Sequence, residues 1–169
     1  MRGAATASFF YYFDKPKIYC ADINPFQIQV FSKNIKKFFV DTQSKKTISN
    51  LSSHINEEFD IIIDDGSHNI KDQIITLNIL FKRLKKDGIY VIEDASQYLF
   101  SKNLNQDNLN YGAKEILLSI KKNDNSKISY MSNDEVKKNQ NEIKNIFIEK
   151  GNYFLDGINI SEIVFIEKN

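Results

Sequence analysis

Short apolar segments alternate with helical patterns up to residue 94, and this alternation limits the possible folds more than any other feature of the chain. Strand-like apolar runs cover residues 17–22, 38–41, 59–64 and 89–94, and helical patterns lie between them at 26–37, 44–53 and 69–85. Strands that alternate with helices favour parallel pairing with right-handed crossovers. We therefore predict an α/β fold with a mostly parallel sheet, covered by helices on both faces.

The composition of the strands and helices supports this prediction. Residues 61–63 and 89–92 are continuous apolar runs, as in strands that are buried on both faces of a parallel sheet. The clearest helix is the one over 69–85, in which apolar residues recur at steps of three and four.

The remaining segments are less regular. Residues 1–13 indicate an amphipathic helix rather than a signal peptide, because no small-residue cleavage site follows their aromatic residues. Beyond residue 94 we expect a loop over 95–110, a helix over 111–122 and weak structure over 127–140. Two final strands, 143–149 and 160–167, predict an antiparallel hairpin on the edge of the sheet. No linker divides the chain, so we treat residues 1–169 as one domain.

Charge and cysteine content exclude several classes of protein. The chain has 23 Lys and Arg residues against 22 Asp and Glu residues, and this balance gives no field that would gather nucleic acid or anionic lipid. No apolar run approaches the roughly 18 to 20 residues that cross a bilayer. Because Cys20 is the single cysteine, no internal disulfide forms, which favours the cytoplasm. We therefore expect neither a nucleic-acid nor a membrane partner.

Acidic residues stand at the end of every predicted strand. They are Asp22, Asp41, Asp64 with Asp65, and Glu93 with Asp94. In an open parallel sheet the carboxyl ends of the strands meet at the edge where ligands bind. One such acid is ordinary, because Asp often caps the following helix. A series of crowded carboxylates resists ionisation unless a cation or hydrogen-bond donors compensate, so the sequence predicts a bound metal, a polyhydroxylated ligand, or both.

Three segments resemble class I S-adenosylmethionine-dependent methyltransferases. They are IYCADINP at 18–25, FDIIIDDGSH at 59–68 and LKKDGIYVIED at 84–94. More narrowly, they resemble metal-dependent sugar O-methyltransferases of the macrolide-tailoring type and their cephalosporin hydroxylase-like relatives. The resemblance extends from residue 2 to about 95, and more loosely through the final hairpin. It implies a Rossmann-like three-layer sandwich and an enzyme that methylates a hydroxyl of a sugar or glycan with the help of Mg²⁺.

The resemblance also implies which residues bind S-adenosylmethionine. Asp22 would hold the two ribose hydroxyls, since a carboxylate accepts both hydrogens at once. The segment Asp41, Thr42 and Gln43 would lie beside the adenine. The further cofactor-binding residues on this basis are Gly3 and Asp64. Helix capping remains an alternative role for Asp22 and for Asp41.

The same resemblance assigns the metal site and the base. Asp65, Glu93 and Asp94 would hold a hard divalent ion such as Mg²⁺, and Asp65 would thereby take part in catalysis. His68 would act as the general base for the acceptor hydroxyl. In the alternative interpretation, residues 65–68 form a turn that caps the helix from residue 69, and the acids at 93 and 94 are merely solvated.

One part of the family pattern is absent. Of the usual first strand and its Gly-rich turn, residues 2–4 alone remain, as a possible tail of that turn. In the methyltransferase strand order 3-2-1-4-5-7-6, the missing strand lies in the centre, between the strands at 17–22 and 59–64. Each buried amide left unpaired there would cost about 1 to 3 kcal/mol. We therefore expect an N-terminally truncated chain that folds poorly, pairs its second and fourth strands directly, or binds cofactor weakly.

Two alternatives compete with an active methyltransferase. The first is a non-catalytic remnant that needs a partner or the missing N-terminal segment to bind cofactor. The second is a nicotinamide-binding enzyme, which fits less well because no G-x-G-x-x-G motif precedes a helix. The expected partner is a small-molecule or glycan hydroxyl acceptor. The sequence is also compatible with a homo-oligomer.

Overall fold

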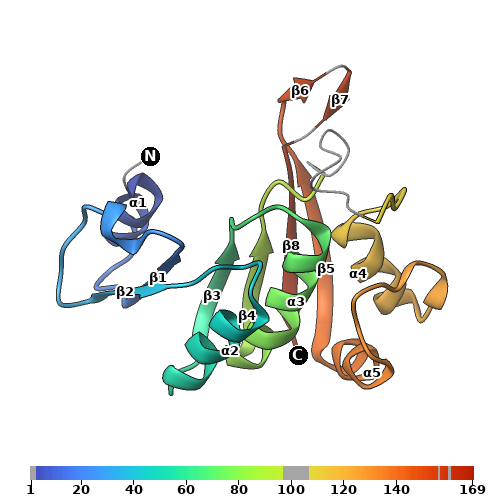
Figure 1. The fold of residues 1–169 in the computed structure, drawn as a ribbon, viewed down its shortest axis with the longest axis horizontal. Coiled ribbons are helices and arrows are strands. Elements are labelled where there is room, and N and C mark those ends of the chain that lie inside the picture. Colours follow the sequence, from blue (N-terminus) through green and yellow to red (C-terminus); the bar gives the residue numbers. More distant parts are fainter. Residues whose placement is uncertain (1–2, 97–106, 156, 160) are drawn as a thin grey trace.

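The structure, a computed structural model, describes residues 3–96, 107–155, 157–159 and 161–169. The helices are α1 (Ala4–Tyr12), α2 (Lys45–His54), α3 (Ile70–Leu80), α4 (Ala113–Lys122) and α5 (Asn133–Glu142), with short 3₁₀ turns at Pro25–Gln27, Phe81–Arg83 and Asn125–Lys127. The strands are β1 (Ile18–Asp22), β2 (Ile35–Phe39), β3 (Phe59–Asp64), β4 (Leu84–Ile92), β5 (Ile143–Lys150), β6 (Phe154–Leu155), β7 (Ile158–Asn159) and β8 (Glu162–Lys168). Figure 1 shows their arrangement.

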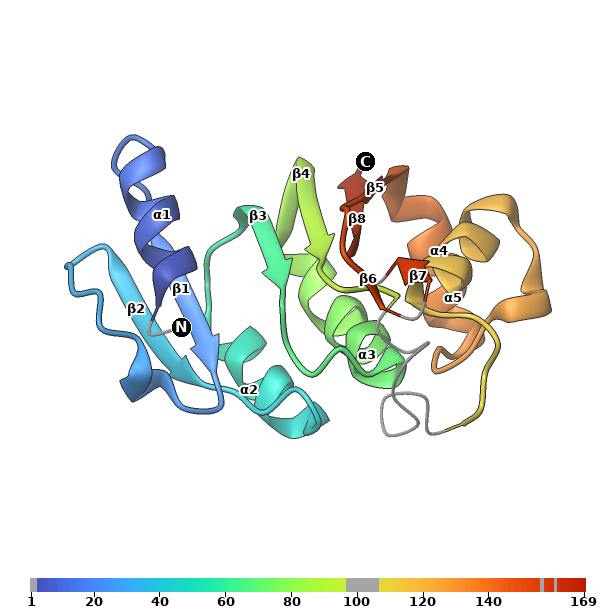
Figure 2. The ribbon, with the colours of Figure 1, turned by 90° about the horizontal axis from the view of Figure 1, so that it is seen from above.

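The strands form two main sheets rather than one. β1 pairs with β2 in parallel, and the second sheet has the order β3-β4-β8-β5. Within the second sheet β3 and β4 are parallel, whereas β8 is antiparallel to both of its neighbours. The strand order across both sheets matches the expected one with its central strand left out. The expected direct pairing of the second and fourth strands is wrong, because β1 and β3 belong to different sheets (Figure 2).

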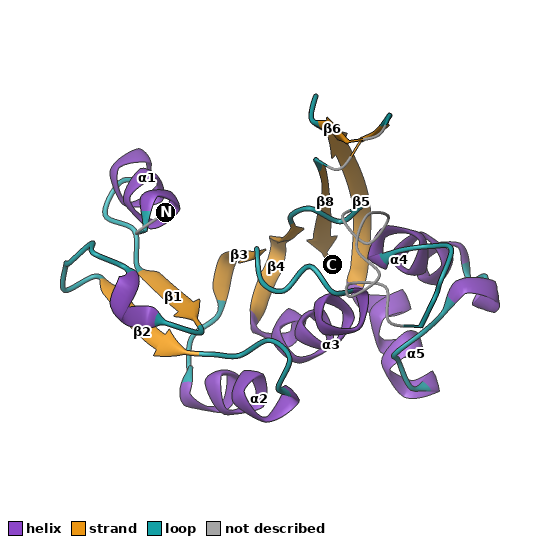
Figure 3. Cartoon of the chain, turned by 45° about the horizontal axis from the view of Figure 1, so that its top comes forward, coloured by secondary structure: helices purple, strands orange, loops and turns teal. Residues whose placement is uncertain are grey.

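The chain has the predicted Rossmann-like α/β architecture, but in the described residues helices lie on both sides of the smaller sheet alone. The larger sheet packs its helices on one face, and Ile63, Ile89 and Phe147 on the other face are each more than a third exposed, so the expected cover on both faces is wrong there. Figure 3 shows α1 on one side of β1 and β2, with α2 on the other. The larger core packs α3 and α4 against β4 and β8, around the fully buried Tyr90 and Phe81. A smaller core packs α2 against Tyr19, Phe38 and Phe59, and so joins the two sheets through side chains.

The helix expected over 26–37 is wrong. The chain instead makes the 3₁₀ turn Pro25–Gln27, runs irregularly and enters β2 at Ile35. Of the apolar residues that suggested a helical face, Ile28 is buried, but Phe31 is 83% exposed. A helix there would have no core to cover, whereas β2 gains a parallel ladder with β1.

Other boundaries also differ from the prediction. Helix α3 ends at Leu80 instead of residue 85, and β4 begins at Leu84 instead of residue 89 and so includes Asp87 and Gly88. Residues 127–140, expected to be weakly structured, contain most of α5, whose N-terminus is fixed by a capping box. The final hairpin is confirmed as β5 and β8, with the small β6–β7 ribbon in its link. Of the predicted loop, residues 97–106 lie outside the described residues, as does the expected strand start at 160.

Helix α1 does not bury an apolar face as predicted. None of its residues is buried, and the aromatic rings of Tyr11 and Tyr12 are both more than 80% exposed. Its contact with the sheet includes Thr6, whose hydroxyl lies 3.4 Å from the sulfur of Cys20. None of the helices in the described part of the chain has the length and apolarity to span a bilayer.

Candidate functional site

The carboxyl ends of β3 and β4 bring three potential ligand groups together. Asp65 and His68 follow β3, and Asp94 follows β4. One ligand atom of each residue lies within 4.8 Å of the other two. The His68 Nε2 atom is 3.8 Å from Asp65 Oδ1 and 3.9 Å from Asp94 Oδ2. The structure therefore brings together, after two neighbouring strands, Asp65 and Asp94 of the three expected metal ligands, with His68 beside them.

The backbone is unusual at two of these residues. His68 and Asp94 both have left-handed φ values, of 55° and 50°. For residues other than glycine this conformation costs of order 1 kcal/mol or more, and it persists where surrounding contacts hold it. In addition, the Nδ1 atom of His68 is buried and has no hydrogen-bond partner among the described residues. The ring thus presents Nε2 to the two carboxylates and leaves Nδ1 without a partner in the described part of the chain.

The electrostatics show that the acids crowd one another. Burial raises the pKa of Asp65, and the nearby Asp94 carboxylate raises it further, whereas His68 opposes the shift. Burial also raises the pKa of Glu93, followed by the charges of Asp65 and Asp94. Glu93 therefore lies within electrostatic reach of the cluster, although it offers no atom inside the 4.8 Å group. A divalent cation would relieve this repulsion.

Asp64 is directed toward the interior of the protein. Its side chain is buried, the hydroxyl of Tyr90 donates to its Oδ2 over 3.3 Å, and the backbone N–H of Gly66 is a second partner. Burial raises the pKa of the carboxyl group to about 7. The carboxyl group that was predicted to contact the cofactor thus already accepts hydrogen bonds from two donors within the protein.

Asp22 and Asp41 lie at the ends of the other sheet. Each accepts a hydrogen bond from the backbone two residues on, Asp22 from Asn24 over 2.6 Å and Asp41 from Gln43 over 3.0 Å. Asp41 does not cap α2, whose N-cap is Ser44. Both acids therefore make local turns and retain a second carboxylate oxygen, so turn formation and ligand binding remain compatible.

Thr42 connects the two halves of the site. A Cβ atom on Gly66 would lie only 3.0 Å from the Thr42 side chain and 3.0 Å from Asp64 Oδ1. The loop after β2 thus packs directly on the turn that carries Asp65. Gly3, the other predicted glycine, has a φ of 89° and lies at the start of α1, where its backbone packs on Ile28.

Two further polar residues lie next to the cluster and were not predicted as site residues. The Ser67 hydroxyl donates to Asp72 Oδ2 over 2.7 Å, and the N–H of Asn69 donates to Ser67 Oγ over 3.3 Å. Asp72 lies in the first turn of α3 and is buried. Its acidic side chain at a helix N-terminus is common in sequences, so no pattern distinguished it.

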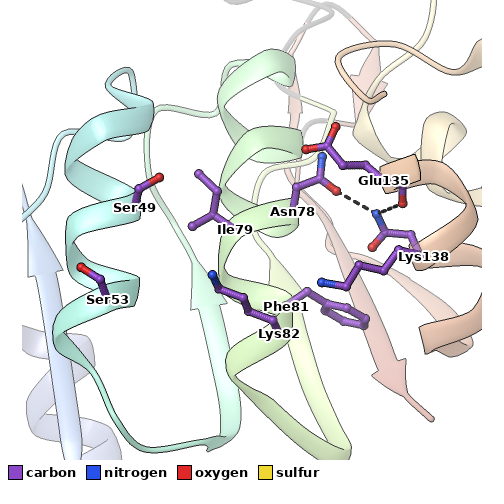
Figure 4. Close-up of a pocket in the computed structure, with 9 residues that line it drawn as sticks. Ser49, Ser53, Asn78, Ile79, Phe81, Lys82, Glu135 and Lys138 are labelled. Atoms are coloured by element: carbon purple, nitrogen blue, oxygen red, sulfur yellow. Dashed lines mark hydrogen bonds between the residues drawn. The ribbon is translucent and has the colours of Figure 1, made fainter. Parts of the chain in front are cut away.

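The described residues also form a pocket away from this edge. It has a volume of about 300 Å³ and lies between α2, α3 and α5 (Figure 4). Asn139 lines it and donates to Asn78 over 2.8 Å. The pocket lies between helices that cover the sheet, whereas the acidic cluster follows the strand ends. We therefore assign the pocket no role in the chemistry of the acidic cluster.

Comparisons with known proteins agree with the fold. A family model described as a methyltransferase domain matches residues 3–151. The MycE methyltransferase of the mycinamycin biosynthetic pathway, solved with Mg, SAH and mycinamycin VI, superposes with a TM-score of 0.69 at 17% identity. The match covers 97% of this chain but 39% of MycE, so the chain spans well under half of that protein.

Smaller proteins superpose over more of their length. An rRNA methylase from Streptococcus thermophilus matches with a TM-score of 0.56 at 12% identity, covering 99% of this chain and 82% of that protein. A Streptococcus mutans protein named as a methyltransferase, in complex with SAH, gives a TM-score of 0.54 at 15% identity, covering 99% and 84%. No curated protein sequence matches the chain.

Proposed function

The chain belongs to the methyltransferase domain family, and from this premise we propose that it transfers a methyl group from S-adenosylmethionine to a hydroxyl, of a sugar or glycan, with the assistance of Mg²⁺. The observation that carries the proposal is the cluster of Asp65, His68 and Asp94 at the carboxyl ends of neighbouring strands. The presence of Mg and SAH together in MycE supports the same pairing of ion and cofactor here.

The residues at this edge fit a magnesium ion. Asp65 and Asp94 offer carboxylate oxygens, the ligands that Mg²⁺ prefers, and Glu93 adds a third carboxylate beside them. The raised pKa values of Asp65 and Glu93 reflect repulsion and burial that a bound cation would offset. When bound, Mg²⁺ lowers the pKa of a coordinated hydroxyl.

His68 is suited to take the hydroxyl proton. Its Nε2 atom faces the two carboxylates, so this nitrogen of the neutral ring can accept the proton. The acceptor oxygen then forms a bond to the methyl carbon as the carbon–sulfur bond breaks, and S-adenosylhomocysteine leaves. Because the methyl group is already on a good leaving group, alignment and charge placement supply most of the catalysis.

The cofactor would lie toward the other sheet. Asp22 keeps one carboxylate oxygen free of its turn and is exposed, as a partner for ribose hydroxyls requires. The loop with Asp41, Thr42 and Gln43 packs beside Gly66 and would border the adenine. Gly3 would lie near the methionyl end, and Asp64 would support the edge from inside.

A second candidate function, a chain that binds cofactor only after another strand is added, is favoured by the open edges of β1 and β3. The backbone N–H of Ile18 donates to the C=O of Asn34, just before β2, and the C=O of Asp22 accepts from the N–H of Val40, just after it. The backbone groups of Ile18 and Asp22 therefore point toward β2. Backbone groups alternate along a strand, so those of Tyr19 and Ala21 point away from β2.

The same argument applies to β3. The C=O of Asp64 accepts from Glu93 after β4, so the backbone groups of Ile61 and Ile63 point away from β4. β3 contains neither Lys nor Pro, the residues that usually protect an exposed edge, and Ile61 is 42% exposed. We propose that a strand preceding α1 completes the sheet between these edges.

Calorimetric titration with S-adenosylhomocysteine, with and without Mg²⁺, tests both candidates. The active-enzyme proposal expects binding by this chain. The second candidate expects no heat from this chain and tight binding once in-frame upstream residues are restored. Absence of binding in both forms would exclude cofactor use altogether.

Two substitutions test the roles at the edge, in whichever form binds cofactor. Asp65→Ala should abolish metal-stimulated transfer and spare S-adenosylhomocysteine binding. His68→Ala should slow transfer while the metal still binds, whereas loss of metal binding would make His68 a ligand instead of the base. Full activity in either variant would contradict the mechanism.

A further inference from the structure

His68 is held in a conformation that an isolated chain would rarely adopt. Its φ of 55° lies in the left-handed region, and residues on both of its sides are tied down by hydrogen bonds. Ser67 precedes it and Asn69 follows it. The N–H of Asn69 donates to Ser67 Oγ, so this single bond spans residue 68 and closes a small loop around it.

A buried carboxylate anchors this loop. The Ser67 hydroxyl, which accepts from Asn69, donates its own hydrogen to Asp72 Oδ2 over 2.7 Å. Asp72 is 9% exposed and lies on α3, a helix packed into the larger core. The orientation of Ser67 is thereby fixed by a rigid element, with a bond of the stronger, charge-assisted kind.

Capping of α3 does not account for this arrangement. Asn69 is the N-cap, and its side chain already accepts from the N–H of Lys71. The bond between Ser67 and Asp72 is therefore additional to the cap. What it holds is the backbone on either side of His68.

We propose that Ser67 and Asp72 are positioning residues for His68, holding its backbone left-handed so that Nε2 faces Asp65 and Asp94. The inference rests on the proposed function, in which His68 is the base beside the metal. Without these two side chains the backbone relaxes and the ring leaves the carboxylates.

Proton NMR of the two histidines tests this directly, because the chain contains His68 and His54 alone. The Nδ1–H of His54 donates to the backbone C=O of Asn50 over 2.7 Å at the C-terminal end of α2, so this ring serves as an internal reference. At saturating Mn²⁺, the paramagnetic ion should broaden the ring signals of His68 and leave those of His54 sharp. In Ser67→Ala and Asp72→Ala, at the same Mn²⁺ occupancy, the broadening of His68 should fall severalfold.

The metal-free protein provides a second readout. In EDTA, Ser67→Ala should shift the His68 ring signals toward those of His54, and the Asn69 amide should exchange faster. Ser67→Thr keeps the hydroxyl and should restore the wild-type signals. Ser126→Ala is the matched control, since Ser126 makes the same bond to Asp124 over 2.9 Å on an exposed turn, and it should change neither histidine.

The outcomes separate the two proposals. If Mn²⁺ broadens neither histidine in the wild-type chain, the metal site is wrong, and the metal-free signals alone decide the positioning role. If the His68 signals of a folded Ser67→Ala variant match the wild type in both readouts, the positioning proposal is overturned. If Asp72→Ala does not fold, Ser67→Ala and its Thr counterpart still decide it.

Discussion

At the scale of single residues, the site contains residues in environments that are unfavourable for their type. Asp64 is a carboxyl group inside the protein, and His68 and Asp94 have backbone angles that favour glycine. The sequence motif D-D-G-S-H allowed Asp65 and His68 to be selected. It did not reveal that Asp64 would turn inward, because two adjacent acids at a strand end look alike until the direction of each side chain is known.

Asp64 should make the stability of the chain depend on pH. Burial raises its folded pKa to about 7, well above the ordinary value near 3.8, so the folded state binds a proton that the unfolded state has lost. The free energy of unfolding should therefore fall as pH rises from about 4 to 7, by a few kcal/mol at about 1.4 kcal/mol per unit of pKa shift. Urea unfolding at several pH values measures this.

The variant Asp64→Asn isolates this effect from those of other carboxyl groups. It removes the ionisable group and can keep hydrogen bonds to Tyr90 and Gly66. We expect its stability to depend less on pH and to exceed that of the wild type above pH 7. An identical pH dependence in the two proteins would show that Asp64 ionises normally.

A side chain at Gly66 should crowd its neighbours, because an added Cβ atom would lie 3.0 Å from both Asp64 Oδ1 and Thr42 Cγ2, and both would have to move. Gly66→Ala should destabilise the chain by about 1 to 3 kcal/mol, the usual cost of overpacking. It should also separate the loop after β2 from the turn after β3. Urea unfolding measures the first effect, and a crystal structure with Thr42 unmoved would contradict the second.

At the scale of elements, sequence periodicity was sufficient where a core covers the segment. The helix starting near residue 70 was predicted because its apolar residues pack into the larger core. The strand at 59–64 was also predicted, although of its residues Ile62 packs on the larger core and Phe59 on the smaller one, while Ile61 is exposed. The helix expected over 26–37 is absent, and Phe26 and Phe31 are exposed there and do not join either core. Periodicity indicates which residues share a face of a helix or strand, but it does not show whether another element packs on that face.

Helix α5 was not predicted, because few of its residues are buried. Val136 and Asn139 are its only described buried residues, so its apolar pattern is weak. The signal that identifies it is the capping box, in which Ser132 accepts from the N–H of Glu135, and Glu135 accepts from the N–H of Ser132. Local hydrogen bonding therefore contributes more to defining this helix than burial does.

Ser132→Ala should accordingly destabilise the chain by about 1 kcal/mol, the usual cost of losing an N-cap side chain. Ser44→Ala is the matched control, because Ser44 is the N-cap of α2 but makes no capping bond with its side chain. Urea unfolding of the two variants measures the difference. Equal losses would mean that the capping box is not formed in solution.

At the scale of the whole molecule, the two main sheets are joined without a backbone ladder. Tyr19 of β1 and Phe59 of β3 contact edge to face, with ring centroids 5.2 Å apart, and both pack on α2. The missing central strand was expected from the family pattern, but separate sheets were not. The smaller core is sufficient to hold β1 near β3 through side chains while their facing backbone groups stay unpaired.

Hydrogen exchange measured by NMR should reveal these facing edges. The amides of Ala21 and Ile63 point away from their paired strands, so they should exchange much faster than those of Cys20 and Ile62 next to them. Addition of a strand between β1 and β3 should slow both. Equal protection within each pair in this chain would mean that the edges are already covered.

Strand β8 has a further consequence for how the protein is made. It lies between β4 and β5, and Lys168 donates from its side chain to the carbonyls of Phe81 and Leu84. The sheet beneath the edge with Asp65 and Asp94 is therefore completed only when residues 162–168 are made, after β3 and β4 have left the ribosome. During that interval the nascent chain exposes the apolar residues of β4 that β8 later covers, and we expect chaperones to bind there.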